Sequence, residues 1–217
     1  MSPEELIQQQ KDSVIKGNRA LAADLARKAL EMDVDLLQCI ENGYGAGIRK
    51  VGALWEEGEY FLPELAQGAD AMKAAMEIIQ PALKARRQIR KVHGTIVIGT
   101  VEGDIHDIGK TLVATFLEAN GFQVFDLGKD VPLDRFVEKA QEESADIICL
   151  SALLTTTMTG QARLVKTLEE KGLRERFAVI VGGAPVTPEY AKSIGADGFG
   201  TNAVNALSEA LKIMEAR

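Results

Sequence analysis

Residues 95–119 read TIVIGTVEGDIHDIGKTLVATFLEA, and they contain the pattern that decides the fold. The apolar run Thr95–Thr100 has the length and β-branched composition of a buried strand. The segment Lys110–Ala119 has the spacing of a helix, and the loop Gly103–Lys110 lies between the two. A strand followed directly by a helix is the unit from which parallel sheets are built.

The same alternation continues toward the end of the chain. Short apolar runs predict further strands at Phe122–Asp126, Asp146–Leu150, Ala178–Val181 and Gly198–Phe199. The intervening segments predict helices at Leu133–Glu142, Gly160–Lys171, Glu189–Ile194 and Asn202–Glu215. This pattern predicts a five-stranded parallel sheet of the flavodoxin-like or Rossmann-like kind, covered by helices on both faces. Ligands bind such sheets at the carboxyl ends of the strands.

Residues 1–88 show helical spacing instead. Four helix starts are marked by residues that cap, open or break helices: Ser2-Pro3-Glu5, Gly17-Asn18, Asp33 and, after the break at Gly58, Pro63. Four amphipathic helices with short connections predict a small four-helix bundle. The fold class is therefore expected to be α + α/β, with a helical domain over 1–88 and a parallel-sheet domain over 89–217.

The composition limits the classes of function. With 46% hydrophobic and 26% charged residues, the chain resembles an ordinary globular protein, and its net charge of -7 disfavours a nucleic-acid partner. No run approaches the roughly 20 apolar residues of a membrane span, and the N-terminus lacks the pattern of a signal peptide. Cys39 and Cys149 lie far apart without a CxxC spacing, which favours a reducing compartment. We expect a cytoplasmic protein without a membrane or nucleic-acid partner.

The loop Gly103–Lys110 follows the first predicted strand, where such a sheet places its ligand site. It contains neither GxxxxGK[ST] nor GxGxxG, which argues against a phosphate-binding loop. Two alternatives stay open from the loop alone. One is a surface loop with a helix-capping aspartate, and the other is acid–base catalysis by His106.

Asp104 and His106 also suit a metal site. A metal-ligating imidazole normally donates its other ring N–H to a carboxylate. Residues i and i+2 can make that contact in a looping segment, whereas on a helix they would point apart. One histidine cannot hold a bare metal ion, and no second histidine or cysteine lies at ligand spacing. Any metal here would therefore bring most of its coordination with it in a macrocycle.

Three motifs in order make a more specific pattern. Asp104-x-His106-x-x-Gly109 is followed by Ser151-x-Leu153 and then by Gly182-Gly183, after the first, third and fourth predicted strands. This set resembles the signature of base-off, histidine-on cobalamin-binding domains, found in methionine synthase, several mutases and the corrinoid proteins of anaerobes. Residues 52–63, GALWEEGEYFLP, are similar to the cap over the upper corrin face in methionine synthase.

The resemblance implies a role for each part of the relay. His106 would replace the cofactor's own dimethylbenzimidazole as the lower axial ligand of cobalt. Asp104 would hold the other imidazole nitrogen. Thr157 would complete a proton relay, at a position where methionine synthase has a serine. Without the resemblance, the hydroxyls here would be read as helix caps.

The resemblance also implies the remaining contacts with the cofactor. The nucleotide tail would pass Gly109, meet Ser151 with Thr155 beside it, and approach the backbone of Gly182 and Gly183 closely. Taken alone, Gly182-Gly183 would be a plain break after a strand. The expected set comprises Gly103, Asp104, Ile105, His106, Asp107, Ile108, Gly109, Ser151, Leu153, Thr155, Gly182 and Gly183. Trp55, Leu62 and Leu65 would join it from the cap; taken alone, Trp55 and Leu62 would be bundle core.

Within the family, Ser151–Met158 and Gly183–Thr187 look most like carriers that serve methylamine or methanol methyltransferases. The resemblance thus implies a non-autonomous corrinoid subunit that carries a methyl group on cobalt. It would receive the methyl group of a methylamine, quaternary amine, methanol or methoxy donor from a substrate-specific corrinoid methyltransferase and pass it to a methyltransferase for tetrahydrofolate or a thiol. A reductive activase would be a third partner. The cap would have to move for each partner, so Gln88–Lys91 is the expected hinge.

Three alternatives remain. An adenosylcobalamin-dependent mutase subunit would need a large substrate barrel, and a helical cap would obstruct it. A cobalamin-dependent sensor would be expected to carry an output domain. A receiver domain would need a cluster of acids and a lysine at the sheet edge, and Asp104 lacks that setting. The alkyl ligand of a copurified cofactor and a DNA-binding assay would distinguish the first two from a carrier.

Overall fold

The first helix begins at Pro3 because Ser2 caps it. The Ser2 hydroxyl accepts a hydrogen bond from the Glu5 amide at 3.2 Å, and the Glu5 carboxylate accepts one from the Ser2 amide at 2.8 Å. This capping box satisfies two amide donors that a helix start leaves without partners. Helix α1 then covers Pro3–Ile15 and α2 covers Arg19–Glu31. Both helices begin where the sequence predicts.

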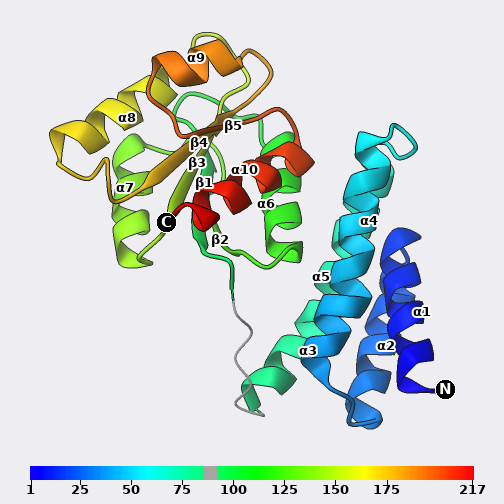
Figure 1. Cartoon of the computed structure of the whole chain (residues 1–217). Helices are drawn as coiled ribbons and strands as arrows, with labels where there is room; N and C mark the ends of the chain where they lie inside the picture. Colours follow the sequence, from blue (N-terminus) through cyan, green and yellow to red (C-terminus); the bar gives the residue numbers. More distant parts are fainter. Residues whose placement is uncertain (86–91) are drawn as a thin grey trace. The chain divides into compact units, whose positions relative to one another are not determined.

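The next helical stretch begins later than predicted. Its cap is Asp35, whose carboxylate accepts the Leu37 amide at 2.9 Å, whereas Asp33 has a φ of 50° and lies outside the helix. The stretch consists of α3, a π-helical segment η1 and α4, and the long helix α5 follows it (Figure 1). The bounds of these four elements are Leu36–Gln38, Cys39–Tyr44, Gly45–Glu56 and Leu62–Ala85. The predicted start directly after Asp33 is therefore wrong by two residues.

The computed structural model describes residues 1–85 and 92–217, and the chain divides into two compact units, Met1–Lys91 and Val92–Arg217. The predicted boundary between residues 88 and 89 and the predicted hinge Gln88–Lys91 lie outside the described residues. The helical stretches of the first unit bury an apolar core, as expected for a bundle. Its largest fully buried members are Leu6, Leu36, Tyr44, Ile48, Leu65, Met72 and Ile79.

In the second unit, strands and helices alternate as predicted, and the strand ends differ from the prediction by one residue at most. The strands are β1 Thr95–Thr100, β2 Gln123–Asp126, β3 Ile147–Ser151, β4 Ala178–Gly182 and β5 Gly198–Gly200. The helices are α6 Ile108–Ala119, α7 Leu133–Glu142, α8 Thr159–Glu170, α9 Pro188–Ser193 and α10 Ala203–Glu215. Across both described ranges, no helix combines the length and apolar character that a membrane crossing requires.

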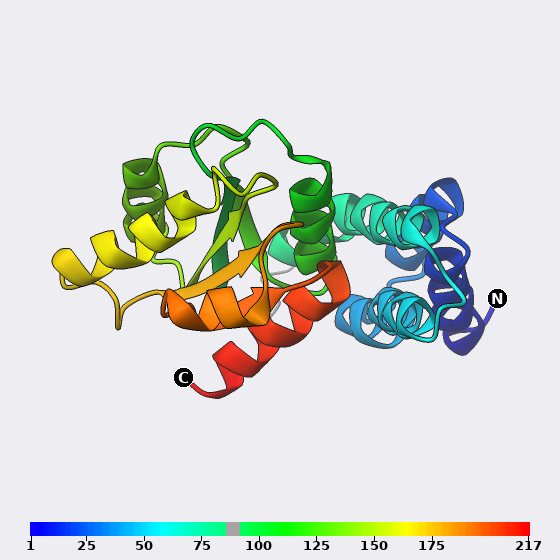
Figure 2. The same ribbon diagram turned by 90° about the horizontal axis from the view of Figure 1, so that it is seen from above.

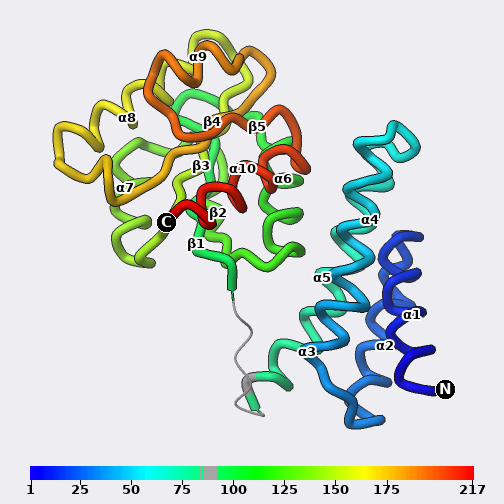
Figure 3. Tube along the Cα trace, in the orientation of Figure 1, coloured from blue at the N-terminus to red at the C-terminus, as the bar shows by residue number. Residues whose placement is uncertain are grey.

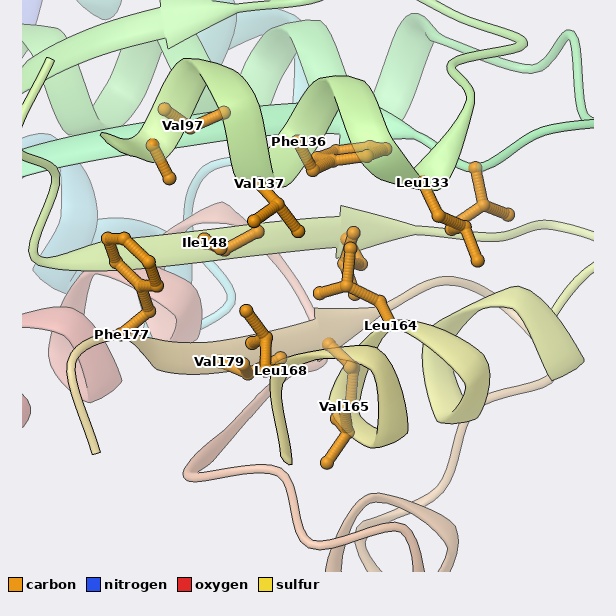
Figure 4. Packing of buried hydrophobic residues seen from close by; sticks show 14 of the residues in the cluster. Val97, Leu133, Phe136, Val137, Ile148, Leu164, Val165, Leu168, Phe177 and Val179 are labelled. Atoms are coloured by element: carbon orange, nitrogen blue, oxygen red, sulfur yellow. The ribbon is translucent and has the colours of Figure 1, made fainter. Parts of the chain in front are cut away.

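Helices cover both faces of the sheet, because alternate residues of each buried strand point to opposite sides. Ile96 and Ile98 of β1 pack with α6 and α10 on one face, whereas Val97 packs with α7 and α8 on the other. Figure 2 shows these two helix layers with the sheet between them. Figure 4 shows the second cluster, where Phe136 of α7 and Leu164 of α8 meet the strands. The predicted α/β architecture is thereby confirmed.

The order of the strands determines where a ligand can bind. The order is β2-β1-β3-β4-β5, and all neighbours are parallel. The chain moves outward on one side from β1 and on the other side from β3, so the switch point lies between these two strands. Thr100, Ser151 and Gly182 are in register at the carboxyl ends. The segments that follow β1, β3 and β4 lie together at that end (Figure 3).

Substitution of Phe136 tests how much the packing of α7 against the sheet contributes to stability. The Phe136 ring is completely buried and lies over Gly99 of β1, where an added Cβ would come within 2.7 Å of ring carbons. Phe136→Ala is expected to lower the free energy of unfolding of the second unit by about 3–5 kcal/mol, measured by denaturant titration. Arg135→Ala on the same helix, which breaks only an exposed ion pair with Glu138, should cost less than about 1 kcal/mol. Equal losses in the two variants would contradict this account.

Candidate functional site

The loop between β1 and α6 places a charged group in the interior. Asp104 has no exposed surface, whereas its neighbours Ile105 and Ile108 are 66% and 83% exposed. Asp107 occupies the cap position of α6, but its side chain makes no capping hydrogen bond. The carboxylate of Asp104 does not cap α6 either, because its hydrogen bonds go to His106 and to the loop after β3. The alternative of a helix-capping aspartate therefore does not describe this loop.

One oxygen of the Asp104 carboxylate holds His106. Its Oδ1 lies 2.8 Å from the imidazole Nδ1 and accepts the His106 amide at 3.1 Å. The segment is irregular rather than helical, so the i and i+2 side chains meet as the sequence predicts. With Nδ1 engaged by a carboxylate, Nε2 is the ring nitrogen that can coordinate a metal. The His106 side chain is 47% exposed, so a ligand can reach it.

The other oxygen of Asp104 is held by the loop after β3. Its Oδ2 accepts the Thr157 hydroxyl at 2.7 Å, the Leu153 amide at 2.7 Å and the Leu154 amide at 3.3 Å. His106, Asp104 and Thr157 thus form one contiguous set of hydrogen bonds across two loops. The two backbone donors were not among the expected contacts, since an amide carries no side-chain signal in a sequence.

These donors determine the ionisation state of Asp104. Burial by itself raises the pKa of the carboxyl group. The hydrogen bonds from Thr157, from the Leu153 amide and from His106 lower it by more, so the pKa lies well below the usual range of an aspartate. The carboxylate is therefore charged at neutral pH and acts purely as an acceptor.

Thr100 is a further residue of the site that sequence reasoning missed. It is the last residue of β1 and is fully buried, and its hydroxyl donates to the carbonyl oxygen of His106 at 3.0 Å. It lies in register with Ser151, which is half-buried at the end of β3. The sequence offered one signal for this role, a hydroxyl residue at the carboxyl end of the first predicted strand, shortly before the loop Gly103–Lys110. Thr100 fixes the backbone of His106 as Asp104 fixes its ring.

The predicted glycines have different physical reasons. Gly183 has a φ of 126°, and a Cβ there would lie 1.8 Å from the carbonyl oxygen of Ala152. A Cβ on Gly182 would approach the carbonyl oxygen of Gly200 to 2.8 Å. Packing within the protein therefore requires both, independently of any ligand. A Cβ on Gly109 would meet nothing within 4 Å, so Gly109 borders open space.

The surroundings of His106 suit a large, partly apolar ligand. Exposed apolar side chains come from the loop after β1, from the first residue of α6 and from the loop after β3: Ile105, Ile108, Leu153 and Leu154. Thr155 on the loop after β3 is also exposed. Within the described residues, no group of three histidine, cysteine, aspartate or glutamate side chains could hold a metal ion. The donor set consequently fits a metal that is already coordinated by a macrocycle and lacks one axial ligand.

The three residues predicted from the helical half differ in exposure. Leu62 is the first residue of α5 and is 50% exposed, and Trp55 near the end of α4 is half-buried. Leu65 has no exposed surface and belongs to the core of the helical unit. Phe61, which was not predicted, is 65% exposed beside Leu62. Leu62 and Trp55 therefore have surface that a ligand could reach, whereas Leu65 has none.

Both units of the chain resemble proteins that bind B12. Two families described as B12 binding domains match it, one over residues 6–80 and the other over residues 94–208. Trimethylamine corrinoid protein 1 of Methanosarcina acetivorans is 45% identical over 213 residues, which are 98% of this chain and 99% of that protein. Dimethylamine corrinoid protein 2 of the same organism is 46% identical over 215 residues, which are 98% of this chain and 98% of that protein.

Solved structures show the same likeness. A chain of the methanol:cobalamin methyltransferase complex from Methanosarcina barkeri matches with a TM-score of 0.87 and 30% identity, over 100% of this chain and 82% of that one. A cobalamin-binding protein from Desulfitobacterium hafniense matches with a TM-score of 0.77 and 32% identity, over 95% of this chain and 98% of that one. The likeness therefore extends over both units.

Replacing Asp104 by asparagine tests its buried charge in the protein without cofactor. Asp104→Asn replaces one acceptor oxygen by an NH₂ group, which cannot accept the hydrogen bonds that the carboxylate accepted. This variant should lose about 2–4 kcal/mol of stability at neutral pH. The folded-state pKa of Asp104 lies below its unfolded value of about 3.9, so its contribution is complete above that value and is lost as the pH falls below it. The advantage of the wild type over the variant should shrink accordingly in urea titrations carried into the acid range.

The matched control for this prediction is Asp107→Asn in the same loop. Its carboxylate is partly exposed and lies 3.9 Å from the Lys129 ammonium. This variant should keep wild-type stability within about 1 kcal/mol and the wild-type dependence on acid. If Asp104→Asn were as stable as this control at neutral pH, the proposed role of the buried charge would be refuted.

Proposed function

This chain belongs to the corrinoid protein family with B12 binding domains, and we propose that it carries a methyl group on the cobalt of a cobalamin ligated by His106. The observation that carries the proposal is the Asp104 carboxylate, which binds Nδ1 of the half-exposed His106 and so leaves Nε2 as the nitrogen available to a metal. When bound, a corrinoid supplies a cobalt centre that accepts a methyl group from one partner and releases it to another. The residues of this chain supply ligation, orientation and protection.

His106 would hold the metal in this proposal, and Asp104 would determine which of its ring nitrogens faces it. Because Oδ2 of Asp104 also accepts the Thr157 hydroxyl, a proton gained by the imidazole on losing the metal would be stabilised by a connected set of hydrogen bonds. Ligation and protonation of His106 are thereby coupled. This is the role that Thr157 takes in the proposal, as the serine does in methionine synthase.

A histidine ligand requires that the cofactor's own base leave the cobalt. We infer a base-off, histidine-on state, in which the nucleotide tail enters the space beside Gly109 at the α6 side of the sheet. Ser151 points to the same face as Thr100, Ile98 and Cys149, because side chains two residues apart share a face. Ser151 is thus placed to bond the displaced base, with the exposed Thr155 nearby in the chain.

We further propose that apolar side chains of the helical unit cover the bound cofactor. Leu62 and Trp55 present apolar surface that would exclude water from the reactive face of the cobalt. The expected hinge at Gln88–Lys91 would let this unit move aside for each partner, and it remains part of the proposal. Leu65 is fully buried, so it belongs to the core of the helical unit in this proposal.

Relatives indicate the class of partner and substrate. The methanol:cobalamin methyltransferase complex contains a chain similar to this one, which supports a substrate-specific methyltransferase as partner. Since the trimethylamine and dimethylamine corrinoid proteins are more than 40% identical over nearly their whole length, we infer that the methyl donor is a methylated amine. A methyltransferase for tetrahydrofolate or a thiol and a reductive activase complete the proposed set. Cys39 and Cys149 are free thiols, as the inferred cytoplasmic location requires.

Anaerobic reconstitution with cobalamin tests the proposed ligand directly. We expect the cobalt(II) form of the wild type to show hyperfine splitting from one nitrogen that is lost in His106→Ala, with affinity lower by about 10- to 100-fold. Cobalamin labelled with ¹⁵N in dimethylbenzimidazole identifies the nitrogen, because a protein ligand leaves the splitting unchanged by the label. A splitting that responds to the label, or a wild type that loses cobalamin on a desalting column, would refute the proposal.

The apolar cover can be tested separately through Leu62. Leu62→Ala is expected to speed the reaction of the cobalt(I) form of the reconstituted protein with a small alkyl iodide severalfold, because less apolar surface shields the metal. Leu21→Ala on α2, which removes a leucine that is 40% exposed, is the matched control and should react like the wild type. Equal rates in all three proteins, followed by visible absorption, would exclude Leu62 from the cover.

A further inference from the structure

The segment between β2 and α7 runs beside the loop that carries Asp104 and His106. The Leu127 amide donates to the carbonyl oxygen of Ile98 at 2.8 Å, and the Thr100 amide donates to that of Gly128 at 2.9 Å. The Val131 amide donates in turn to the carbonyl oxygen of Thr100 at 3.0 Å. These bonds continue the pairing with β1 beyond the end of β2, so the segment lies beside the end of β1 from which the loop begins.

Asp130 in this segment makes two bonds to the loop after β1. Its Oδ1 accepts the Gly103 amide at 2.7 Å, and its own amide donates to the carbonyl oxygen of Asp104 at 2.9 Å. Asp130 thus binds the amide at the start and the carbonyl oxygen at the end of the Gly103-Asp104 dipeptide. The side chain of Asp104 is meanwhile held from the other side by Thr157 and the amides after β3. The backbone and the carboxylate of Asp104 are therefore fixed by different loops.

The backbone conformation of Asp130 is unusual. Its φ is 54°, in the left-handed region that non-glycine residues rarely adopt. Among the described residues, Asp33 and Ser144 share this feature, but each directly follows the C-cap residue of a helix, where a left-handed residue commonly ends the turn. Asp130 follows no helix and ends a loop at the site. A costly conformation there requires compensation from the contacts that it makes possible.

An ion pair between a buried lysine and a partly exposed aspartate holds the beginning of the same segment. The Lys110 side chain is 1% exposed and donates to both carboxylate oxygens of Asp126 at the end of β2. Oδ1 of Asp126 also accepts the Gly128 amide at 2.8 Å. Lys110 lies in the first turn of α6, directly after the loop that carries His106. The segment that presents Asp130 is thus anchored to the helix that the loop enters.

We propose that Asp130 is a positioning residue, which holds the Gly103-Asp104 backbone so that the Asp104 carboxylate meets Nδ1 of His106. This inference rests on the proposed ligation of cobalt by His106. Without the Asp130 carboxylate, the Gly103 amide loses its acceptor and the loop is held by one bond fewer at this point. Asp104 then orients the imidazole less strictly, and the ligand is presented to the metal in a wider range of orientations.

Two substitutions separate the side chain of Asp130 from its backbone conformation. Asp130→Gly removes the acceptor and tolerates the positive φ, whereas Asp130→Asn keeps an oxygen acceptor and also tolerates it. Asp134→Ala on α7 is the control, since it removes an exposed carboxylate paired only with Lys171 at 2.9 Å. The three variants and the wild type are reconstituted with cobalamin, and the dissociation constant and the nitrogen splitting of the cobalt(II) form are measured.

We expect Asp130→Gly to bind cobalamin about three- to tenfold more weakly, the effect of one hydrogen bond, and to show a smaller nitrogen-ligated fraction. Asp130→Asn and Asp134→Ala should match the wild type in both measurements. Wild-type splitting and affinity in Asp130→Gly would overturn the inference, and so would an Asp130→Asn variant as impaired as Asp130→Gly. A wild type without protein-derived nitrogen splitting would instead refute the proposed ligation by His106.

Hydrogen exchange gives an independent measurement in the protein without cofactor, should Asp130→Gly fail to fold. The Gly103 amide is expected to exchange slowly in the wild type and in Asp130→Asn, because an acceptor oxygen is retained in both. Exchange of this amide at the rate of an unstructured peptide in the wild type would show that Asp130 does not hold it, and would overturn the inference.

Discussion

The site depends on one buried, ionised carboxylate. Asp104 has no contact with solvent, and a charge in that position is tolerated only when hydrogen-bond donors meet its oxygens. The donors come from its own loop after β1 and from the loop after β3. These loops are adjacent because β1 and β3 are neighbours in the sheet, although distant in sequence. The strand order is therefore a requirement of the chemistry.

The arrangement combines an accessible imidazole with a rigid support. Nearly half of the His106 side chain is exposed, yet its ring is held by Asp104 and its carbonyl oxygen by Thr100. A side chain that ligates a metal benefits from such support, because it loses little conformational freedom when the metal binds. In the proposed methyl carrier, the same support would keep the imidazole of His106 in one orientation whether or not it ligates the metal.

Much of this molecule could be predicted because the relevant signals are local. The five strands and the contact between Asp104 and His106 follow from periodicity and from a spacing of two residues. The π-helical segment Cys39–Tyr44 and the cap at Asp35 were missed, since tertiary packing chooses among local conformations of similar energy. The hydrogen bond from the Leu153 amide could not be predicted for another reason, because nearly every residue has the same backbone donor.

The sequence by itself determined the alternation of strands and helices, the contact between Asp104 and His106, and, through its motifs, the resemblance to the family, because these depend on periodicity and on side chains at fixed spacing. Only the tertiary structure decided which donors surround Asp104, that Leu65 is core rather than contact, and that Gly182 and Gly183 are required by neighbouring carbonyl groups. Those features depend on distances between segments far apart in the chain. Such distances arise when strands pair and helices pack, so a linear pattern does not contain them.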